Sequence, residues 1–237
     1  WTVHPSWELV AEATEVAGRD VAALLLDADA DELRDTRNSQ LATYVLSLVV
    51  LDAVERLGVD PARVAGHSLG EYTALTAAGV LSFADGVRLV AERGEAMQVA
   101  AAERAGTMAA VVALDDDDVA VACARTDGDV WVANHNAPGQ VVIAGSPEAI
   151  EAAGAQAKEL GARRVLPLEV GGAFHTPFMA SARDRLRKAL AEADLRDAEL
   201  PVLANVDARA HTSADDWENL LAAQLCSPVR WRHILQA

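Results

Sequence analysis

A serine and a histidine, residue types that do chemistry as a pair, stand in distinctive settings in this sequence. Ser68 is the centre of Gly66-His-Ser-Leu-Gly70, a G-x-S-x-G pattern between the apolar run Arg63–Ala65 and an alanine-rich stretch, Glu71–Ala78. A nucleophile on a tight strand-to-helix turn needs neighbours without side chains, so that the backbone bends and the hydroxyl stands clear. The pattern therefore predicts strand, elbow and helix, with Ser68 as a nucleophile. A glycine-flanked turn with an idle serine is the alternative, because such short matches also arise by chance.

The main-chain amides that open the helix after Ser68 point toward the space above this serine. The first N–H groups of a helix have no partner within it, and they can hold a developing negative charge. The amide of Leu69 is the first of them. We expect it to stabilise an oxyanion.

The second candidate, His175, lies in Gly171-Gly-Ala-Phe-His-Thr-Pro177. Thr176 is a good N-cap and Pro177 suits the first helical position, so a helix is expected directly after the histidine. The positive end of a helix disfavours imidazolium and helps to keep His175 neutral, as a general base must be. Together, Ser68 and His175 have the character of a nucleophile and its base. If Ser68 is left aside, His175 could equally well be a loop histidine with no functional role.

The length and charge of the chain exclude several classes of protein. With 237 residues, 51% of them hydrophobic, it can bury a substantial core as an ordinary globular protein. The net charge of −16 argues against nucleic acid and anionic membrane surfaces as partners, because both require clustered Lys and Arg. The longest apolar stretch, Leu41–Leu51, is interrupted and too short for a membrane span, and no secretory signal is recognised.

The cysteines and the acidic segments indicate neither a disulfide framework nor a metal site. Cys123 and Cys226 lie far apart and form no C-x-x-C pair, which indicates a reducing cytoplasm. The acidic segment Asp27–Asp35 lacks the EF-hand pattern and is expected to be a solvated loop.

Two long helices are expected in the first half of the chain. One spans Asn38–Leu57, with Asn38 or Ser39 as its cap. The other spans Phe83–Arg104, with Ser82 as its cap. From spacing alone, Arg93 in the second helix is expected to be a surface residue paired with a neighbouring Glu.

The middle of the chain has a pattern of short strands and helices, which predicts a small inserted unit. The order of its elements is βαββαβ, which is the split β-α-β arrangement of ferredoxin-like domains. The expected segments are strand Thr107–Leu114, helix Asp115–Arg125, strand Val130–Ala133, strand Gln140–Ala144, helix Pro147–Leu160 and strand Arg164–Val170. A core strand within Leu200–Val206 and a helix near Asp215–Leu225 follow.

Seven separated motifs resemble, in order, those of malonyl-CoA:acyl carrier protein transacylases and the related acyltransferase domains of polyketide synthases. They are Gly66-His-Ser-Leu-Gly-Glu71, Arg93-Gly with Met97-Gln98, Gly106-Thr-Met-Ala-Ala110, Asn134-x-Asn-x-Pro-Gly-Gln-Val-Val-Ile-Ala-Gly145, Gly172-Ala-Phe-His-Thr176, Asn205-Val-Asp207 and Gln224-Leu-x-Ser-Pro-Val229. This resemblance covers nearly the whole chain. It implies an α/β-hydrolase-like catalytic subdomain, residues 1–105 and 171–237, with an inserted ferredoxin-like subdomain, residues 106–170.

The resemblance also implies a role for each site residue. Ser68 matches the nucleophile that takes the acyl group from coenzyme A, and His175 matches its base. The main-chain carbonyl of Gln224 would orient the histidine. Arg93 matches the arginine that clamps the free carboxylate of the acyl group, which replaces the surface role expected from spacing. Asn134 resembles an asparagine near the site, although a role in supporting its hairpin is equally plausible.

Leu69 and Phe174 resemble malonyl-type members of the family, in which an aromatic ring fills the space that an α-methyl group would need. A single methyl is worth only about 1–3 kcal/mol in a pocket, so this preference is soft. The implied reaction is a two-step transfer of malonyl from its coenzyme A thioester to the phosphopantetheine thiol of an acyl carrier protein. It uses no metal and no tightly bound cofactor.

Two features of the sequence stand apart from the family pattern. The family's opening strand, which ends in Gly-Gln-Gly-Ser-Gln, has no counterpart before Trp1. The family's later Gly-Pro-Gly segment has no counterpart before the last residue, Ala237. We therefore expect this sequence to be a piece of a longer protein. Carrier proteins are usually acidic, so docking on this acidic chain needs a local basic patch. The candidates are Arg163 with Arg164, or Arg183, Arg185, Arg187 and Lys188.

Three other functions remain open from the sequence. A serine thioesterase or hydrolase would use the same pair of residues with water as the acceptor. A transacylase could carry an atypical acyl group between carrier proteins. An idle docking or scaffold domain of a larger synthase is disfavoured by the intact Ser68, His175 and Arg93.

Overall fold

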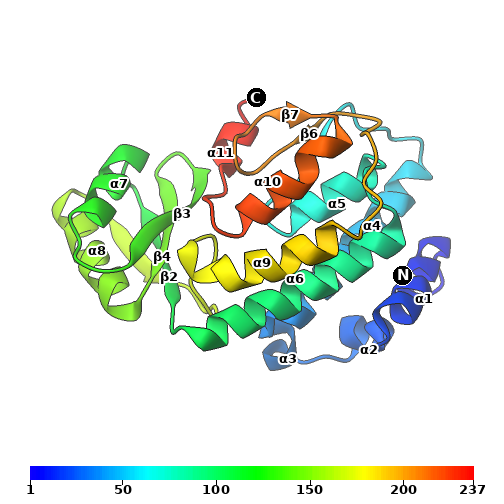
Figure 1. The fold of residues 1–237 in the computed structure, drawn as a ribbon, viewed down its shortest axis with the longest axis horizontal. Coiled ribbons are helices and arrows are strands. Elements are labelled where there is room, and N and C mark those ends of the chain that lie inside the picture. Colours follow the sequence, from blue (N-terminus) through cyan, green and yellow to red (C-terminus); the bar gives the residue numbers. More distant parts are fainter. The chain divides into compact units, whose positions relative to one another are not determined.

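The computed structural model describes residues 1–237, with helices and strands in mixed order (Figure 1). The chain forms two compact units. Unit 1 comprises Trp1–Glu95, Leu186–Ala204 and Arg209–Glu218, and unit 2 comprises Ala96–Arg185, Asn205–Ala208 and Asn219–Ala237. The mixed α/β class that the sequence predicts is confirmed. No helix is both long enough and apolar enough to span a membrane.

Unit 1 is mainly helical around a three-stranded sheet. The sheet has the order β1-β6-β7, in which β1 is parallel to β6 and β6 is antiparallel to β7. Its elements are α1 (Glu8–Ala17), α2 (Val21–Leu26), α3 (Ala30–Arg34), α4 (Thr36–Glu55), β1 (Val64–Ala65), α5 (Gly70–Ala77), the first part of α6 (Phe83–Glu103), β6 (Val202–Leu203) and β7 (Ala210–His211).

The start of α4 differs from the sequence expectation by one turn. Asp35, not Asn38 or Ser39, is the N-cap, because its carboxylate accepts a hydrogen bond of 3.0 Å from the Arg37 amide. The acidic segment before it is not a plain loop either. It contains α3, whose cap Asp29 accepts from the amide of Glu32 at 2.9 Å.

Unit 2 contains the predicted βαββαβ order. Its strands form one antiparallel sheet in the order β3-β4-β2-β5. Both helices of this order lie against the same apolar core, in which Val111, Val119 and Ile143 are almost completely buried. The elements are β2 (Thr107–Val112), α7 (Asp116–Ala124), β3 (Val130–Ala137), β4 (Gln140–Gly145), α8 (Pro147–Glu159) and β5 (Arg164–Pro167).

The last part of the chain closes the outer edge of β3. Val229 forms a parallel bridge with Asn134, and the His135 amide donates to the Val229 carbonyl at 2.8 Å. The short helix α11 (Trp231–Ile234), which the sequence analysis did not predict, follows directly. The remaining helices are α9 (Ala180–Leu190) and α10 (Trp217–Gln224); like α6, each contributes residues to both units.

The core of unit 2 yields a stability prediction. Ile143 on β4 is 1% exposed and belongs to the core cluster, whereas Val121 on α7 is 37% exposed. Ile143→Ala leaves a cavity and is expected to lower the free energy of unfolding by about 2–5 kcal/mol. Val121→Ala is expected to change it by less than about 0.5 kcal/mol. Urea unfolding of both variants measures this, and equal losses would contradict the assigned core.

Candidate functional site

The stretch around Ser68 forms the tight strand-to-helix turn that the sequence predicts. β1 ends at Ala65 and α5 begins at Gly70, and Ser68 between them has a φ of 52°. Only four residues other than glycine have a positive φ in the chain, and Ser68 and His175 are two of them. A left-handed backbone costs a residue with a side chain about 1–3 kcal/mol, and such strain clusters at functional sites.

Gly66 allows this turn to close. A Cβ atom at position 66 would lie 1.8 Å from the Gly70 carbonyl oxygen and 2.6 Å from the Glu71 nitrogen. Neither neighbour can move away, because both belong to the backbone of the first helical turn. The first glycine of the pattern is therefore required by a direct backbone contact.

Some main-chain amides of the turn donate hydrogen bonds to backbone carbonyls, and one amide does not. The N–H groups of Gly70, Glu71 and Tyr72 donate to the carbonyls three residues before them, at 2.9, 3.1 and 3.0 Å. The N–H group of Leu69 donates no hydrogen bond. It is therefore available to an oxygen near Ser68.

Arg93 is placed differently from the expectation based on spacing alone. It is 1% exposed on α6 and is not a surface residue. One terminal nitrogen, Nη2, donates to Ser68 Oγ at 3.1 Å, and the other, Nη1, donates to Gln40 Oε1. Its guanidinium lies 5.6 Å from the centre of the Tyr72 ring, within range of a cation–π interaction.

Burial lowers the pKa of Arg93, because the charged form loses hydration there. An arginine still remains protonated at neutral pH, since its ordinary pKa lies far above 7. The site beside Ser68 thus contains a buried positive charge. Such a charge requires polar partners, and it favours an anionic ligand.

Gln40 is a site residue that the sequence analysis missed. It lies on α4, is 6% exposed, and accepts from Arg93. A signal for it exists in the sequence, because Gln40 is followed at i+4 and i+8 by the buried Tyr44 and Leu48. A polar side chain on the apolar stripe of a helix usually has a buried partner.

His175 and Gln224 are brought together in unit 2. The histidine is 5% exposed, and its Nδ1 lies 2.8 Å from the Gln224 main-chain oxygen. A carbonyl oxygen can only accept, so Nδ1 carries the hydrogen. In the neutral ring Nε2 is then the acceptor, which is the state a general base requires. This is the contact that the family resemblance implies.

The loop that holds His175 is fixed from its far side by Thr176. The hydroxyl of Thr176 accepts from the Phe178 amide at 3.2 Å and donates to the Ala173 carbonyl at 2.6 Å. The predicted cap is thereby confirmed, although the helix opens as a short 3₁₀ turn, Pro177–Met179, before α9. Both bonds hold the loop next to the strained backbone of His175, whose φ is 60°.

Two further predicted residues lie in unit 2. Phe174 is half-buried, and a Cβ atom at Gly172 would lie 3.3 Å from its ring. Asn134 is 6% exposed within β3, where it pairs with Val142 and bridges to Val229. The backbone of Asn134 thus supports the hairpin, one of the two roles expected for this residue.

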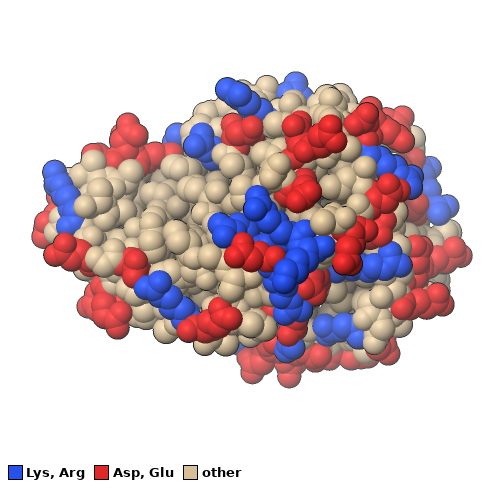
Figure 2. Space-filling view, in the orientation of Figure 1, with Lys and Arg blue, Asp and Glu red and all other residues tan.

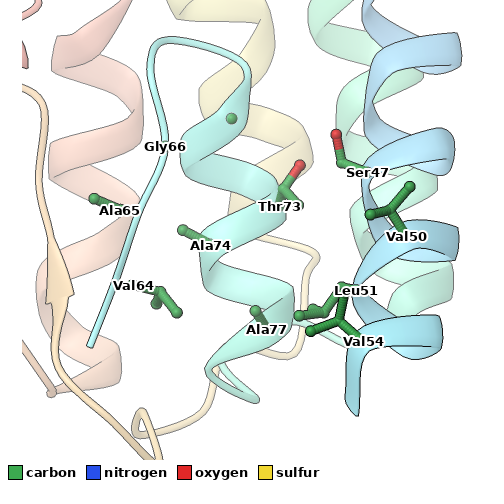
Figure 3. A pocket seen from close by; sticks show the side chains of 11 residues that line it. Ser47, Val50, Leu51, Val54, Val64, Ala65, Gly66, Thr73, Ala74 and Ala77 are labelled. Atoms are coloured by element: carbon green, nitrogen blue, oxygen red, sulfur yellow. The ribbon is translucent and has the colours of Figure 1, made fainter. Parts of the chain in front are cut away.

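An apolar groove flanks the elbow strand (Figure 3). It has a volume of about 410 Å³, and α4, β1 and α5 line it. Figure 3 shows the side chains of Val50, Val54, Val64 and Ala77 around it. Its lining side chains include no acid, base or arginine.

No three His, Cys, Asp or Glu residues are grouped so that they could hold a metal ion. The groups that the structure presents for chemistry are a strained serine beside a buried arginine and a histidine with a fixed tautomer. Such groups suit transfer of an acyl group to and from a hydroxyl.

Comparison with known proteins agrees with that class. Residues 5–237 match the acyl transferase domain family, and the chain belongs to this family. It is 41% identical over 223 residues to the malonyl CoA-acyl carrier protein transacylase of Bacillus subtilis, covering 93% of this chain and 70% of that protein.

Two solved structures are also similar. The acyl carrier protein S-malonyltransferase of Vibrio cholerae has a TM-score of 0.93 and 42% identity, with 98% of this chain and 76% of that chain covered. A malonyl-transacylase in complex with a type II PKS acyl-carrier protein has a TM-score of 0.93 and 39% identity, with 97% and 76% covered.

The elbow geometry leads to a prediction with a matched control. Gly66→Ala forces a Cβ atom into the Gly70 backbone and is expected to prevent folding, or to lower the free energy of unfolding by more than about 3 kcal/mol. Gly70→Ala, four residues away, meets no atom within 4 Å. It is expected to be neutral or to stabilise α5 by up to about 1 kcal/mol. Urea unfolding compares the two, and a mild effect of Gly66→Ala would contradict the tight turn.

Proposed function

We propose that this chain transfers a malonyl group from coenzyme A to the phosphopantetheine thiol of an acyl carrier protein, through an ester of Ser68. The observation that carries the proposal is the buried guanidinium of Arg93 beside Ser68 Oγ. A buried cation at this position supports binding of an anion next to the proposed nucleophile. The relative solved with an acyl-carrier protein supports a carrier as the acceptor.

We also propose the finer architecture that the resemblance implies. The βαββαβ order and the sheet order β3-β4-β2-β5 support a ferredoxin-like subdomain at residues 106–170. The turn at Ser68 supports an α/β-hydrolase-like subdomain built from residues 1–105 and 171–237.

The free thiols of Cys123 and Cys226 support a reducing compartment such as the cytoplasm. Burial raises the pKa of the Cys123 thiol to about 11, and the thiol therefore stays protonated and unreactive.

In the first half-reaction, His175 Nε2 takes the proton of Ser68 Oγ, and Oγ attacks the thioester carbon of malonyl-CoA. The Leu69 amide stabilises the negative oxygen of the tetrahedral intermediate. The carbon–sulfur bond then breaks, and coenzyme A leaves as a thiol with the proton from His175. In the second half-reaction His175 takes the proton of the carrier thiol, and the sulfur attacks the ester carbon. The bond between this carbon and Ser68 Oγ then breaks, and His175 returns a proton to Ser68.

Arg93 selects the acyl group through its charge. A guanidinium binds a carboxylate through two parallel hydrogen bonds, and its Nη2 group can turn from Ser68 Oγ to the substrate. An acetyl group offers no carboxylate, so the buried cation would gain no partner. The half-buried ring of Phe174 adds a weaker preference against an α-methyl group.

Intact mass after brief mixing with malonyl-CoA tests the proposal. A malonyl adduct is expected on the wild type and none on Ser68→Ala. Arg93→Ala is expected to slow the adduct by at least about 30-fold, because a buried charge pair is lost. Arg88→Ala on the same helix removes an exposed arginine paired with Asp85 and should leave the rate unchanged.

Two results of the same experiment would overturn the proposal. Folded wild type without any adduct would exclude malonyl transfer through Ser68 and favour an atypical acyl group. Steady release of malonate, with no transfer to a carrier, would favour a thioesterase.

A second prediction concerns Gln40, which holds the other terminal nitrogen of Arg93. Gln40→Ala removes this acceptor and is expected to reduce kcat/KM for malonyl-CoA about 10- to 100-fold, the worth of a hydrogen bond to a charged group. Gln40→Glu keeps the shape but adds a carboxylate that competes for Arg93, so the loss for malonyl-CoA should be larger still. Gln156→Ala, on the surface of α8, serves as the control. Equal activity of both Gln40 variants and the control would exclude this positioning role.

A further inference from the structure

The last turn of α6 and the residues after it lie directly against the loop that carries His175. A Cβ atom at Gly106 would lie 2.7 Å from the Ala173 nitrogen, and one at Gly172 would lie 2.8 Å from the Ala101 Cβ atom. Neither glycine leaves room for a side chain, so the two segments are in direct contact. All these residues belong to unit 2.

Polar and aromatic contacts join the same two segments further along the chain. Ser181 Oγ donates to Glu103 Oε2 at 2.6 Å. Arg104, the first residue after α6, has its guanidinium carbon 3.8 Å from the centre of the Phe178 ring. This distance is well within the range of a cation–π interaction, which extends to about 6 Å. Phe178 stands three residues after His175.

Strand β3 and the residue before it add two contacts to this cluster. Arg104 Nη2 donates to Asp129 Oδ2. The rings of Trp131 and Phe178 lie edge to face, with centres 5.5 Å apart and an angle of 72° between their planes. Phe178 is 7% exposed. Its ring is therefore held by both a cation and an indole.

Exposure and charge alone do not distinguish Arg104 from other arginines of the chain. Figure 2 shows Lys and Arg side chains at several places on one face of the molecule. The Arg104 side chain is 55% exposed and that of Asp129 is 44% exposed, and such an ion pair contributes little to stability. A cation after the last residue of a helix also stabilises the negative end of that helix. Neither role accounts for the guanidinium lying on the Phe178 ring.

The backbone of His175 requires support from its surroundings. Its φ is 60°, and a left-handed backbone at a residue with a side chain persists only where the surrounding structure holds it. The hydrogen bonds of Thr176 hold one part of this loop. The contacts of Phe178 hold the next part, the 3₁₀ turn Pro177–Met179.

We infer that Arg104 is a positioning residue for the base: its guanidinium fixes the ring of Phe178, and this ring fixes the segment that carries His175. The inference rests on the proposed function, in which His175 is the base. A base acts only within hydrogen-bond reach of the proton that it takes. Arg104 therefore affects the rate of proton transfer and not the affinity for malonyl-CoA.

The rate of Ser68 malonylation at several concentrations of malonyl-CoA tests this inference. Arg104→Ala is expected to lower the maximal rate about tenfold, because a misplacement of about 1 Å can cost up to about 100-fold. The half-saturating concentration of malonyl-CoA is expected to change by less than about twofold. A loss of affinity with an unchanged maximal rate would mean that Arg104 binds coenzyme A, and the positioning role would be excluded.

The matched control is Arg125→Ala. Arg125 is also an exposed arginine directly after a helix of unit 2, in this case α7. Its removal is expected to leave both the maximal rate and the half-saturating concentration unchanged. Equal losses in the two variants would assign the effect to the charge at a helix end and would contradict the inference.

Removal of the base separates a positioning role from a general loss of packing. In a His175→Ala background there is no base to position, so Arg104→Ala is expected to cause no further loss of the residual malonylation rate. The same loss with and without His175 would show that Arg104 supports the fold and not the base.

Hydrogen exchange provides a readout that requires no activity. Arg104→Ala is expected to speed amide exchange in residues 174–180 at least about fivefold, because the segment opens more often, and Arg125→Ala is expected to leave it unchanged. Unchanged exchange in the Arg104 variant would overturn the inference. If the wild type forms no acyl-serine, the proposed function fails, and the exchange result still decides whether Arg104 positions this segment.

Discussion

The close approach of Gly66 to the first turn of α5 is the constraint on which the rest of unit 1 depends. A side chain at position 66 has no space, since the Gly70 carbonyl would lie 1.8 Å from its Cβ atom. Because the chain turns this sharply, Ser68 adopts a left-handed backbone and the Leu69 amide is left without a partner in the helix. One steric fact thus positions the hydroxyl of Ser68 and the Leu69 N–H group that we propose for its oxyanion.

The second constraint is electrostatic. Arg93 carries a positive charge although only 1% of the residue is exposed to water. Its guanidinium contacts Gln40, Ser68 and the ring of Tyr72. A buried arginine gains strongly from an anion that can lie against its guanidinium. The specificity that we propose rests on this buried cation beside Ser68.

The parts of the fold and of the candidate site that depend on local sequence rules could be predicted from the sequence. The G-x-S-x-G turn, the cap at Thr176 and the βαββαβ order follow from residue types at fixed spacing. The burial of Arg93 could not be predicted from spacing, because an arginine with glutamates nearby looks the same on an exposed helix; family resemblance corrected it. Gln40 was missed for a related reason, since its partner lies 53 residues away. β7 and α11 are too short for any periodicity to reveal them.

The positive φ values of Ser68 and His175 mean that the residues proposed for catalysis lower the stability of the fold at these two positions. Glycine accepts a left-handed backbone without the steric penalty of a side chain, so at both positions it would relieve strain while removing the reactive group. Selection for thermal stability alone would then favour glycine where the proposed chemistry requires serine and histidine. A variant of this protein chosen by how well it withstands heat is therefore at particular risk of being an inert one, and stability screens on it need activity as a second criterion.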